Sequence, residues 1–174
     1  PYTTLFRSAE TVRAMANYGS RKKYYHEMEG SNSRIDELQA AMLNVKLKRL
    51  DADNERRRII AQLYTRELQN IESHVIGFRL LHPTSESVHH VYPVFCFERD
   101  KLRMHLKALG IETLIHYPIP LHQQPCLSRY NIANMTFPKA ECIASSVLSL
   151  PMSPVLTEDE VCQVIHAVQS FYGL

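Results

Sequence analysis

The chain has 174 residues, of which 45% are hydrophobic and only 5 are glycine, so it is long enough to bury the core of about one globular domain. Its formal net charge of +2, from 20 basic and 18 acidic residues, gives no electrostatic reason to expect binding to nucleic acid or to a membrane surface. The 4 cysteines are scattered without a CxxC pair, and neither a membrane-spanning apolar run nor a signal peptide is recognisable, which favours a cytoplasmic protein with reduced thiols.

The beginning of the chain differs in character from the rest. Residues 1–8 have no hydrophobic period that matches the next segment, and they resemble the translation of a DNA-sequencing adapter, so we expect them to be non-native. Residues 10–18 have the pattern of the end of a helix that Gly19 terminates. The charged and aromatic stretch 20–29 is expected to be a solvated loop.

A polar turn at residues 30–33 leads into the longest helical pattern in the chain. Gly30 allows backbone angles that are closed to other residues, and Asn32 and the two serines beside it can each cap a helix by accepting hydrogen bonds from its first amides. Arg34 adds a guanidinium with five donors in a fixed geometry, which suits a phosphate better than capping alone requires. Two interpretations stay open here, a simple helix start and a phosphate-binding turn.

Apolar residues then recur at helical spacing over residues 34–72. One continuous helix of this length would extend roughly 57 Å, which suggests a connection between two lobes. The polar stretch 51–54 can instead divide the segment into a pair of helices.

The hydrophobic period changes after residue 73, where β-rich runs and helical runs alternate. The elements predicted in residues 73–174 are strands at 75–81, 88–97 and 111–115 and helices at 99–109, 139–148 and 157–171. This order predicts a small α+β domain whose sheet is covered by helices on one face.

His116 and Tyr117 lie where the third predicted strand meets a loop that is fixed by two prolines. Side chains at such a point can be held rigidly toward a cleft, so both residues are candidate substrate contacts. A histidine here can equally be structural, with its ring hydrogen-bonded to the backbone. A zinc site is not favoured, because no ligand pair has the required spacing among His89, His90, His116 and His122.

Four motifs appear in order along the chain: Asn-Tyr-Gly-Ser at 17–20, Gly-x-Asn-x-Arg-x-Asp-Glu-Leu-Gln-Ala-Ala at 30–41, Gly-Ile-Glu-Thr-Leu-Ile-His-Tyr-Pro-Ile-Pro at 110–120, and Leu-Ser-Leu-Pro-Met at 148–152. Together they resemble the C-terminal half of the sugar aminotransferases of the DegT/DnrJ/EryC1/StrS family. The turn and the Thr-Leu-Ile-His-Tyr-Pro segment are most similar to the branch that aminates dTDP-3-keto-6-deoxyhexoses.

The resemblance implies a fold, a cofactor and a set of site residues. The chain would form the C-terminal portion of the aspartate-aminotransferase fold in a homodimer with its active sites at the interface. The enzyme would use pyridoxal 5'-phosphate to move an amino group from glutamate to a dTDP-linked keto-deoxysugar. Asn32 and Arg34 would bind the phosphate of the cofactor held by the partner subunit, and His116 and Tyr117 would contact the substrate.

The resemblance also divides the chain and limits what it can do. Residues 9–33 would end the large cofactor domain, 34–72 would connect, and 73–174 would form the small domain. The family's Schiff-base lysine lies before residue 9 in a full-length protein, and no lysine of this chain has matching flanking sequence, so we assign no catalytic residue and expect the fragment alone to be inactive. The alternative is a non-catalytic ligand-binding or regulatory relative with the same fold.

Overall fold

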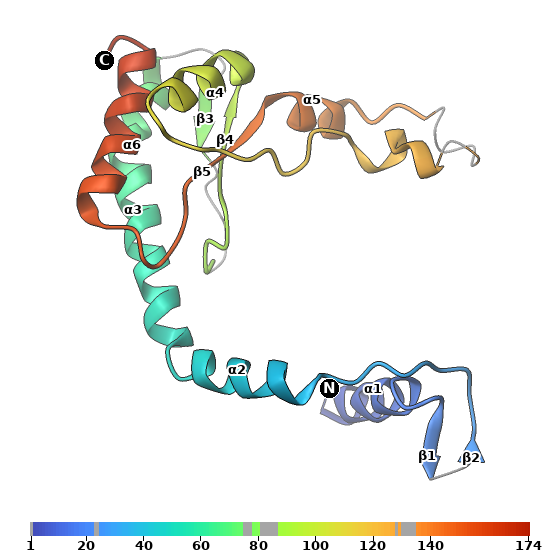
Figure 1. Ribbon diagram of the computed structural model, residues 1–174. Helices are drawn as coiled ribbons and strands as arrows, with labels where there is room; N and C mark the ends of the chain where they lie inside the picture. Colours follow the sequence, from blue (N-terminus) through green and yellow to red (C-terminus); the bar gives the residue numbers. More distant parts are fainter. Residues whose placement is uncertain (1, 23–24, 75–77, 81–86, 128, 130–134) are drawn as a thin grey trace. The chain divides into compact units, whose positions relative to one another are not determined.

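The computed structural model describes residues 2–22, 25–74, 78–80, 87–127, 129 and 135–174. The chain divides into two compact units, Pro1–Leu50 and Asp51–Leu174 (Figure 1). Each unit is treated separately below. No helix within the described residues is both long and apolar enough to cross a membrane.

The described residues of the first unit form α1 at Tyr2–Met15, β1 at Ser20–Lys22, β2 at Tyr25–His26 and α2 at Glu37–Leu47. Helix α1 includes residues 2–8, which belong to the segment expected from the sequence to be non-native. The stretch predicted to be a solvated loop forms instead an antiparallel pair, β1 with β2, in which the Ser20 hydroxyl is 2.7 Å from the carbonyl oxygens of both Lys22 and Tyr25. Because Ser20 is buried and its hydroxyl bonds to both strands, this segment is an ordered hairpin and not a solvated loop.

The polar turn at residues 30–33 packs against the end of α1. The amide of Ser31 donates to the carbonyl of Met15 at 2.8 Å, and the amide of Ser33 donates to the carbonyl of Ala16 at 3.0 Å. A Cβ atom on Gly30 would overlap the backbone of Gly19 and the carbonyl of Met15, so the close approach requires glycine at this position. The turn therefore satisfies carbonyl groups at the C-terminal end of a preceding helix.

Helix α2 begins later than the sequence indicated, so the predicted capping by the turn is wrong. Its N-cap is Asp36, whose carboxylate accepts a hydrogen bond from the amide of Leu38 at 2.8 Å. An aspartate close to the first helical residue satisfies this end directly, and the turn upstream is already bonded to α1. No residue of α2 is buried, and the apolar side chains in and beside it are more than half exposed: Ile35, Leu38, Met42, Leu43, Val45 and Leu47.

The long helical pattern forms two helices, because α3 (Leu50–His74) starts anew after α2 ends. The division falls just before the polar stretch 51–54 and not within it. Asp51 and Asp53 lie in the first turn of α3, where carboxylates are favourable because of the positive end of the helix dipole. Buried apolar residues of α3 recur at helical spacing and face the core: Ile60, Ala61, Tyr64, Leu68 and Ile71.

The second unit is built on an antiparallel sheet in the order β3-β4-β5, formed by Phe78–Leu80, Tyr92–Cys96 and Val147–Leu150. The first two strands lie within the predicted runs and are neighbours, as expected. The start of the third strand was misassigned, because Val147 and Leu148 of β5 lie within the predicted helix 139–148, whereas the observed helix α5 (Pro138–Ser146) ends just before them. A run of four residues is too short for periodicity to distinguish a strand from a helix.

The predicted strand at 111–115 is an extended segment beside β5, joined to it by one bridge. Leu114 and Ser149 exchange two backbone hydrogen bonds, of 3.3 and 2.8 Å. The segment follows α4 (Arg99–Ala108), and the turn between them contains Gly110 with a φ of 79°, in agreement with the predicted helix end. Two 3-10 turns, Leu121–Gln123 and Pro125–Leu127, come next in the proline-containing region.

Helix α6 (Glu158–Phe171) begins with a capping box, in which Thr157 and Glu160 satisfy each other's backbone amides. Figure 1 shows α6 beside α3, and the side-chain amide of Gln169 donates to the carbonyl of Glu67 across this contact. Helices α3, α4 and α6 and the three strands share one hydrophobic core. The α+β architecture predicted for this part of the chain is confirmed.

One contact of this core reaches the connector after β5. Tyr64 is fully buried, its hydroxyl donates to the carbonyl of Pro151 at 2.9 Å, and its ring centre lies 5.0 Å from that of Tyr92. We expect Tyr64→Phe to lower the free energy of unfolding by about 1–3 kcal/mol, because the Pro151 carbonyl loses its donor while the ring still fits. Urea unfolding followed by circular dichroism measures this change. Tyr117→Phe, at an exposed tyrosine, is the matched control and should change stability by less than about 0.5 kcal/mol.

Candidate functional site

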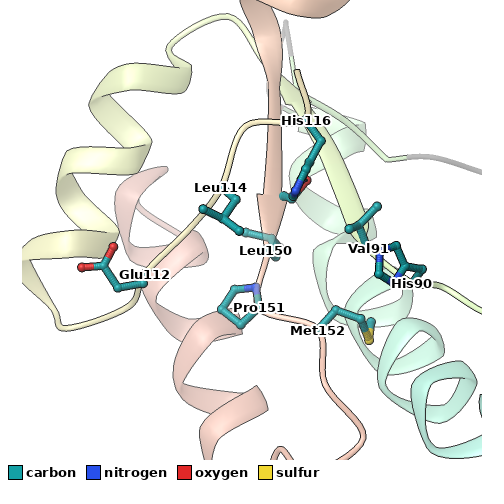
Figure 2. A pocket seen from close by; sticks show the side chains of 9 residues that line it. His90, Val91, Glu112, Leu114, His116, Leu150, Pro151 and Met152 are labelled. Atoms are coloured by element: carbon teal, nitrogen blue, oxygen red, sulfur yellow. The ribbon is translucent and has the colours of Figure 1, made fainter. Parts of the chain in front are cut away.

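A cavity of about 270 Å³ opens where the extended segment 111–116 lies against β5 (Figure 2). Glu112, Leu114 and His116 line it from this segment, which is the alternation expected of extended chain. Figure 2 shows Glu112 and His90 on opposite sides of Leu150 and Pro151. The remaining lining residues come from the segment just before β4, from β5 and from the connector after β5: His90, Val91, Ser149, Leu150, Pro151 and Met152.

His116 is partly buried and has one defined partner. Its Nδ1 atom lies 2.9 Å from the hydroxyl oxygen of Ser149, which is itself 4% exposed. The structural alternative raised from the sequence, a histidine bonded to the backbone, is therefore not the arrangement found. The imidazole is oriented by a side chain of the neighbouring strand, while the residue also lines the cavity.

Tyr117 differs from His116 in its environment. It is 72% exposed, and its ring lies edge-on to the His116 imidazole with 5.6 Å between the ring centres. Tyr117 is not among the residues that line the cavity. Its phenol can contact only a ligand that extends out of the cavity or a surface brought by another part of a larger protein.

The other histidines of this region have separate surroundings. His122 is buried, with Nε2 3.1 Å from a carboxylate oxygen of Glu141, and Glu141 also accepts from the amide of Phe137. Partial burial and the nearby Arg58 guanidinium lower the pKa of His89. Among the described residues, no cluster of histidine, cysteine or acidic side chains is arranged to hold a metal ion.

In the turn at 30–33, the backbone amides of both serines are already paired, whereas the side chains of Asn32 and Arg34 are exposed. The amide of Ser31 donates to the last residue of α1 and that of Ser33 to Ala16 just after it, so these two amides cannot form a cradle for an anion. Asn32 and Arg34 are exposed, and neither side chain makes a hydrogen bond or ion pair within the described part of the chain. A side-chain amide and a guanidinium can both donate hydrogen bonds to phosphate oxygens, so these two residues could hold the phosphate group of a cofactor.

The cavity beside this turn is less suited to the same ligand. It has a volume of about 480 Å³ and is lined by Val12, Met15, Ala16, Glu29, Gly30, Ser31 and Ser33. Glu29 contributes a carboxylate, which would repel a phosphate, and neither Asn32 nor Arg34 belongs to the lining. The first unit therefore offers two exposed donors without an enclosed pocket around them.

Comparison with solved structures defines the class of fold. S. venezuelae DesV, determined in complex with a ketimine intermediate, matches with a TM-score of 0.85 and 41% sequence identity over 95% of this chain and 44% of that one. The fold is that of the C-terminal portion of an aminotransferase, as predicted. The family model described as "DegT/DnrJ/EryC1/StrS aminotransferase family" matches residues 6–169. The chain belongs to this family.

Two curated relatives show how much of a family member is represented. The "Erythromycin biosynthesis sensory transduction protein EryC1" of Saccharopolyspora erythraea is 43% identical over 93% of this chain and 44% of its own length. The "dTDP-3-amino-3,4,6-trideoxy-alpha-D-glucose transaminase" of Streptomyces venezuelae is 42% identical over 94% of this chain and 42% of its own length. The chain thus spans less than half the length of the relatives that it matches.

The sequence alone did not identify Ser149 or Glu112 as residues of this site. Ser149 belongs to the Leu-Ser-Leu-Pro-Met motif, but its contact with His116 joins positions 33 residues apart. Glu112 is four residues before His116 in a segment predicted to be extended, so both side chains belong to the same face. This spacing is the local signal that could have identified Glu112.

Proposed function

We propose that this chain is the C-terminal portion of a pyridoxal-phosphate-dependent nucleotide-sugar aminotransferase, which moves an amino group from glutamate to a dTDP-linked keto-deoxysugar. The observation that carries the proposal is 42% identity to a dTDP-sugar transaminase over 94% of the chain. In the complete enzyme, residues 9–33 would end the cofactor domain, 34–72 would connect, and 73–174 would form the small domain.

His116 and Tyr117 form the substrate side of the proposed site. His116 lines a cavity and is oriented by Ser149, so its ring can meet a polar group of the sugar nucleotide in a fixed position. Tyr117 projects from the surface beside it and would contact a part of the substrate outside the cavity. When bound, the cofactor supplies the electron sink for transamination, and this chain's contribution is to bind and orient the reactants.

Asn32 and Arg34 form the cofactor side of the proposed site, through the phosphate. We expect Asn32→Ala in the complete enzyme to weaken cofactor binding by about 1.5–3 kcal/mol, the loss of one hydrogen bond to a charged group. Equilibrium dialysis of the apoenzyme against pyridoxal 5'-phosphate measures this change. Gln163→Ala, which removes an exposed side-chain amide on α6, is the matched control. Unchanged cofactor affinity in the Asn32 variant would remove Asn32 from the site.

A homodimer is part of the proposal, with the cofactor phosphate of one subunit meeting Asn32 of the other. The exposed apolar side chains along α2 support it, since contiguous apolar surface of this kind is typical of interfaces. In the complete enzyme, the part of the same subunit that lies outside this chain would also cover some of the apolar surface of α2.

A second candidate function is a non-catalytic, regulatory relative of the same fold. The observation that favours it is the name of one relative at 43% identity, a "sensory transduction protein". The two functions are separated by incubating the complete protein with ¹⁵N-glutamate, pyridoxal 5'-phosphate and a dTDP-keto-deoxysugar. An aminotransferase yields ¹⁵N-labelled amino sugar, whereas a regulatory relative binds the nucleotide without forming this product.

A further inference from the structure

We infer that Ser149 is a positioning residue for His116, which holds the imidazole in the tautomer that presents an Nε2–H donor to the cavity. This inference rests on the proposed function, because it deepens the role given there to His116. It adds a residue to the site and specifies the chemistry of the group that His116 recognises, an oxygen acceptor on the substrate.

Ser149 is fixed by its backbone before its side chain is considered. It lies in β5 between two neighbours, paired with Pro93 of β4 on one side and with Leu114 of the extended segment on the other. Its amide donates to the Leu114 carbonyl at 2.8 Å, and its carbonyl accepts from the Leu114 amide at 3.3 Å. Pairing on both edges fixes the direction of the Cα–Cβ bond, so the hydroxyl can move only by rotation about χ1.

The same pairing brings His116 to this hydroxyl. Leu114 and Ser149 are opposite each other, and His116 is two residues further along the extended segment, so it lies on the same face as a diagonal neighbour. Diagonal pairs of this kind are within reach of long side chains, and the Nδ1–Oγ distance is 2.9 Å. The contact therefore follows from the strand register.

The tautomer follows from the hydrogen-bonding capacity of a buried hydroxyl. Ser149 is 4% exposed, and within the described residues its hydroxyl oxygen contacts no hydrogen-bonding group other than His116 Nδ1. If the hydroxyl accepted a hydrogen bond from Nδ1–H, its own O–H would have no acceptor among the described residues. Donation from Ser149 to Nδ1 leaves no unpaired O–H, and it places the single ring proton of neutral His116 on Nε2.

An Nε2–H group at the cavity is a hydrogen-bond donor and does not act as a base. It would recognise a carbonyl, hydroxyl or phosphate oxygen of the sugar nucleotide, and it would discriminate against a donor at the same place. Ser149→Ala would let the two tautomers exchange, so that only part of the population would present the donor at any moment.

The direct test is ¹⁵N spectroscopy of the histidine-labelled chain, in which His116→Gln assigns the resonances among the 9 histidines. Neutral wild-type His116 should show a pyridine-type shift at Nδ1 and a pyrrole-type shift at Nε2. Ser149→Ala should give averaged shifts, and Ser149→Thr, which keeps the hydroxyl, should restore the wild-type pattern. Ser146→Ala is the matched control, because it removes an equally buried hydroxyl that donates to the Cys142 carbonyl instead.

The kinetic test uses the complete enzyme and follows the sugar half-reaction. Ser149→Ala should lower its kcat/KM about 3- to 10-fold, the typical effect of one net hydrogen bond, with the glutamate half-reaction and the Ser146→Ala control unchanged. A wild-type His116 spectrum in Ser149→Ala would overturn the inference, even if the Ser149→Thr variant does not fold. A spectral change without any effect of His116→Ala on the sugar half-reaction would keep the positioning role and reject the proposed substrate contact.

Discussion

After incubation with pyridoxal 5'-phosphate and reduction with borohydride, this chain on its own is expected to carry no single, stoichiometrically labelled lysine, and it is expected not to transaminate. The family's covalent lysine has no counterpart in the sequence. The lysines that the structure describes are all exposed: Lys22, Lys46, Lys48, Lys101, Lys107 and Lys139. None of these exposed positions provides the apolar pocket that activates a lysine as a nucleophile.

Lys101 illustrates the difference from a catalytic lysine. Its ammonium donates to the Glu98 carboxylate, and this hydrogen bond raises its pKa. A lysine that forms an imine needs the opposite shift, which burial or a neighbouring cation provides. Mass spectrometry after reduction should therefore find only low labelling spread over several sites. One fully labelled lysine, together with turnover of a keto sugar nucleotide, would contradict this prediction.

The complete enzyme is the matched control for this experiment. Under the same treatment it should be labelled at one lysine outside the present chain, as the family resemblance implies. If the complete protein is not labelled at all, the regulatory alternative gains support and the catalytic proposal is rejected.

Much of the second unit could be predicted from local signals. Gly110 marks the end of α4 and adopts the expected positive φ, and Thr157 with Glu160 marks the start of α6 as a capping box. The apolar spacing along α3 likewise predicted a buried helix face, which lies on the core. These features depend on residues close together in the sequence, where chain geometry alone determines which groups meet.

The errors came from contacts that only tertiary structure creates. The sequence around Ser31 and Ser33 reads as a helix cap, but their amides are taken by α1, and Asp36 performs the capping. The first two residues of β5 were assigned to the end of a helix, because the pairing of this strand with β4 and with Leu114 is not visible in a four-residue run. His116 could be proposed from its loop position, whereas Ser149 could not, since strand register brings it there.

His116→Ala in the complete enzyme is expected to lower kcat/KM for the sugar half-reaction by about 100-fold, while the glutamate half-reaction stays near wild type. The substitution removes the proposed contact to the substrate, and a hydrogen bond that involves a charged group contributes about 1.5–3 kcal/mol, which corresponds to roughly 10- to 150-fold in kcat/KM. His166→Ala, at an exposed position on α6, is the matched control and should change neither half-reaction.

The central claim, that this chain supplies the substrate side of a sugar aminotransferase, is tested most directly by single-turnover measurements of both half-reactions in His116→Ala. Absorbance of the cofactor reports the conversion by glutamate and, separately, the return conversion by the keto sugar nucleotide. We predict a slow second step with a normal first step. Equal loss in both steps, or wild-type rates in both, would contradict the claim.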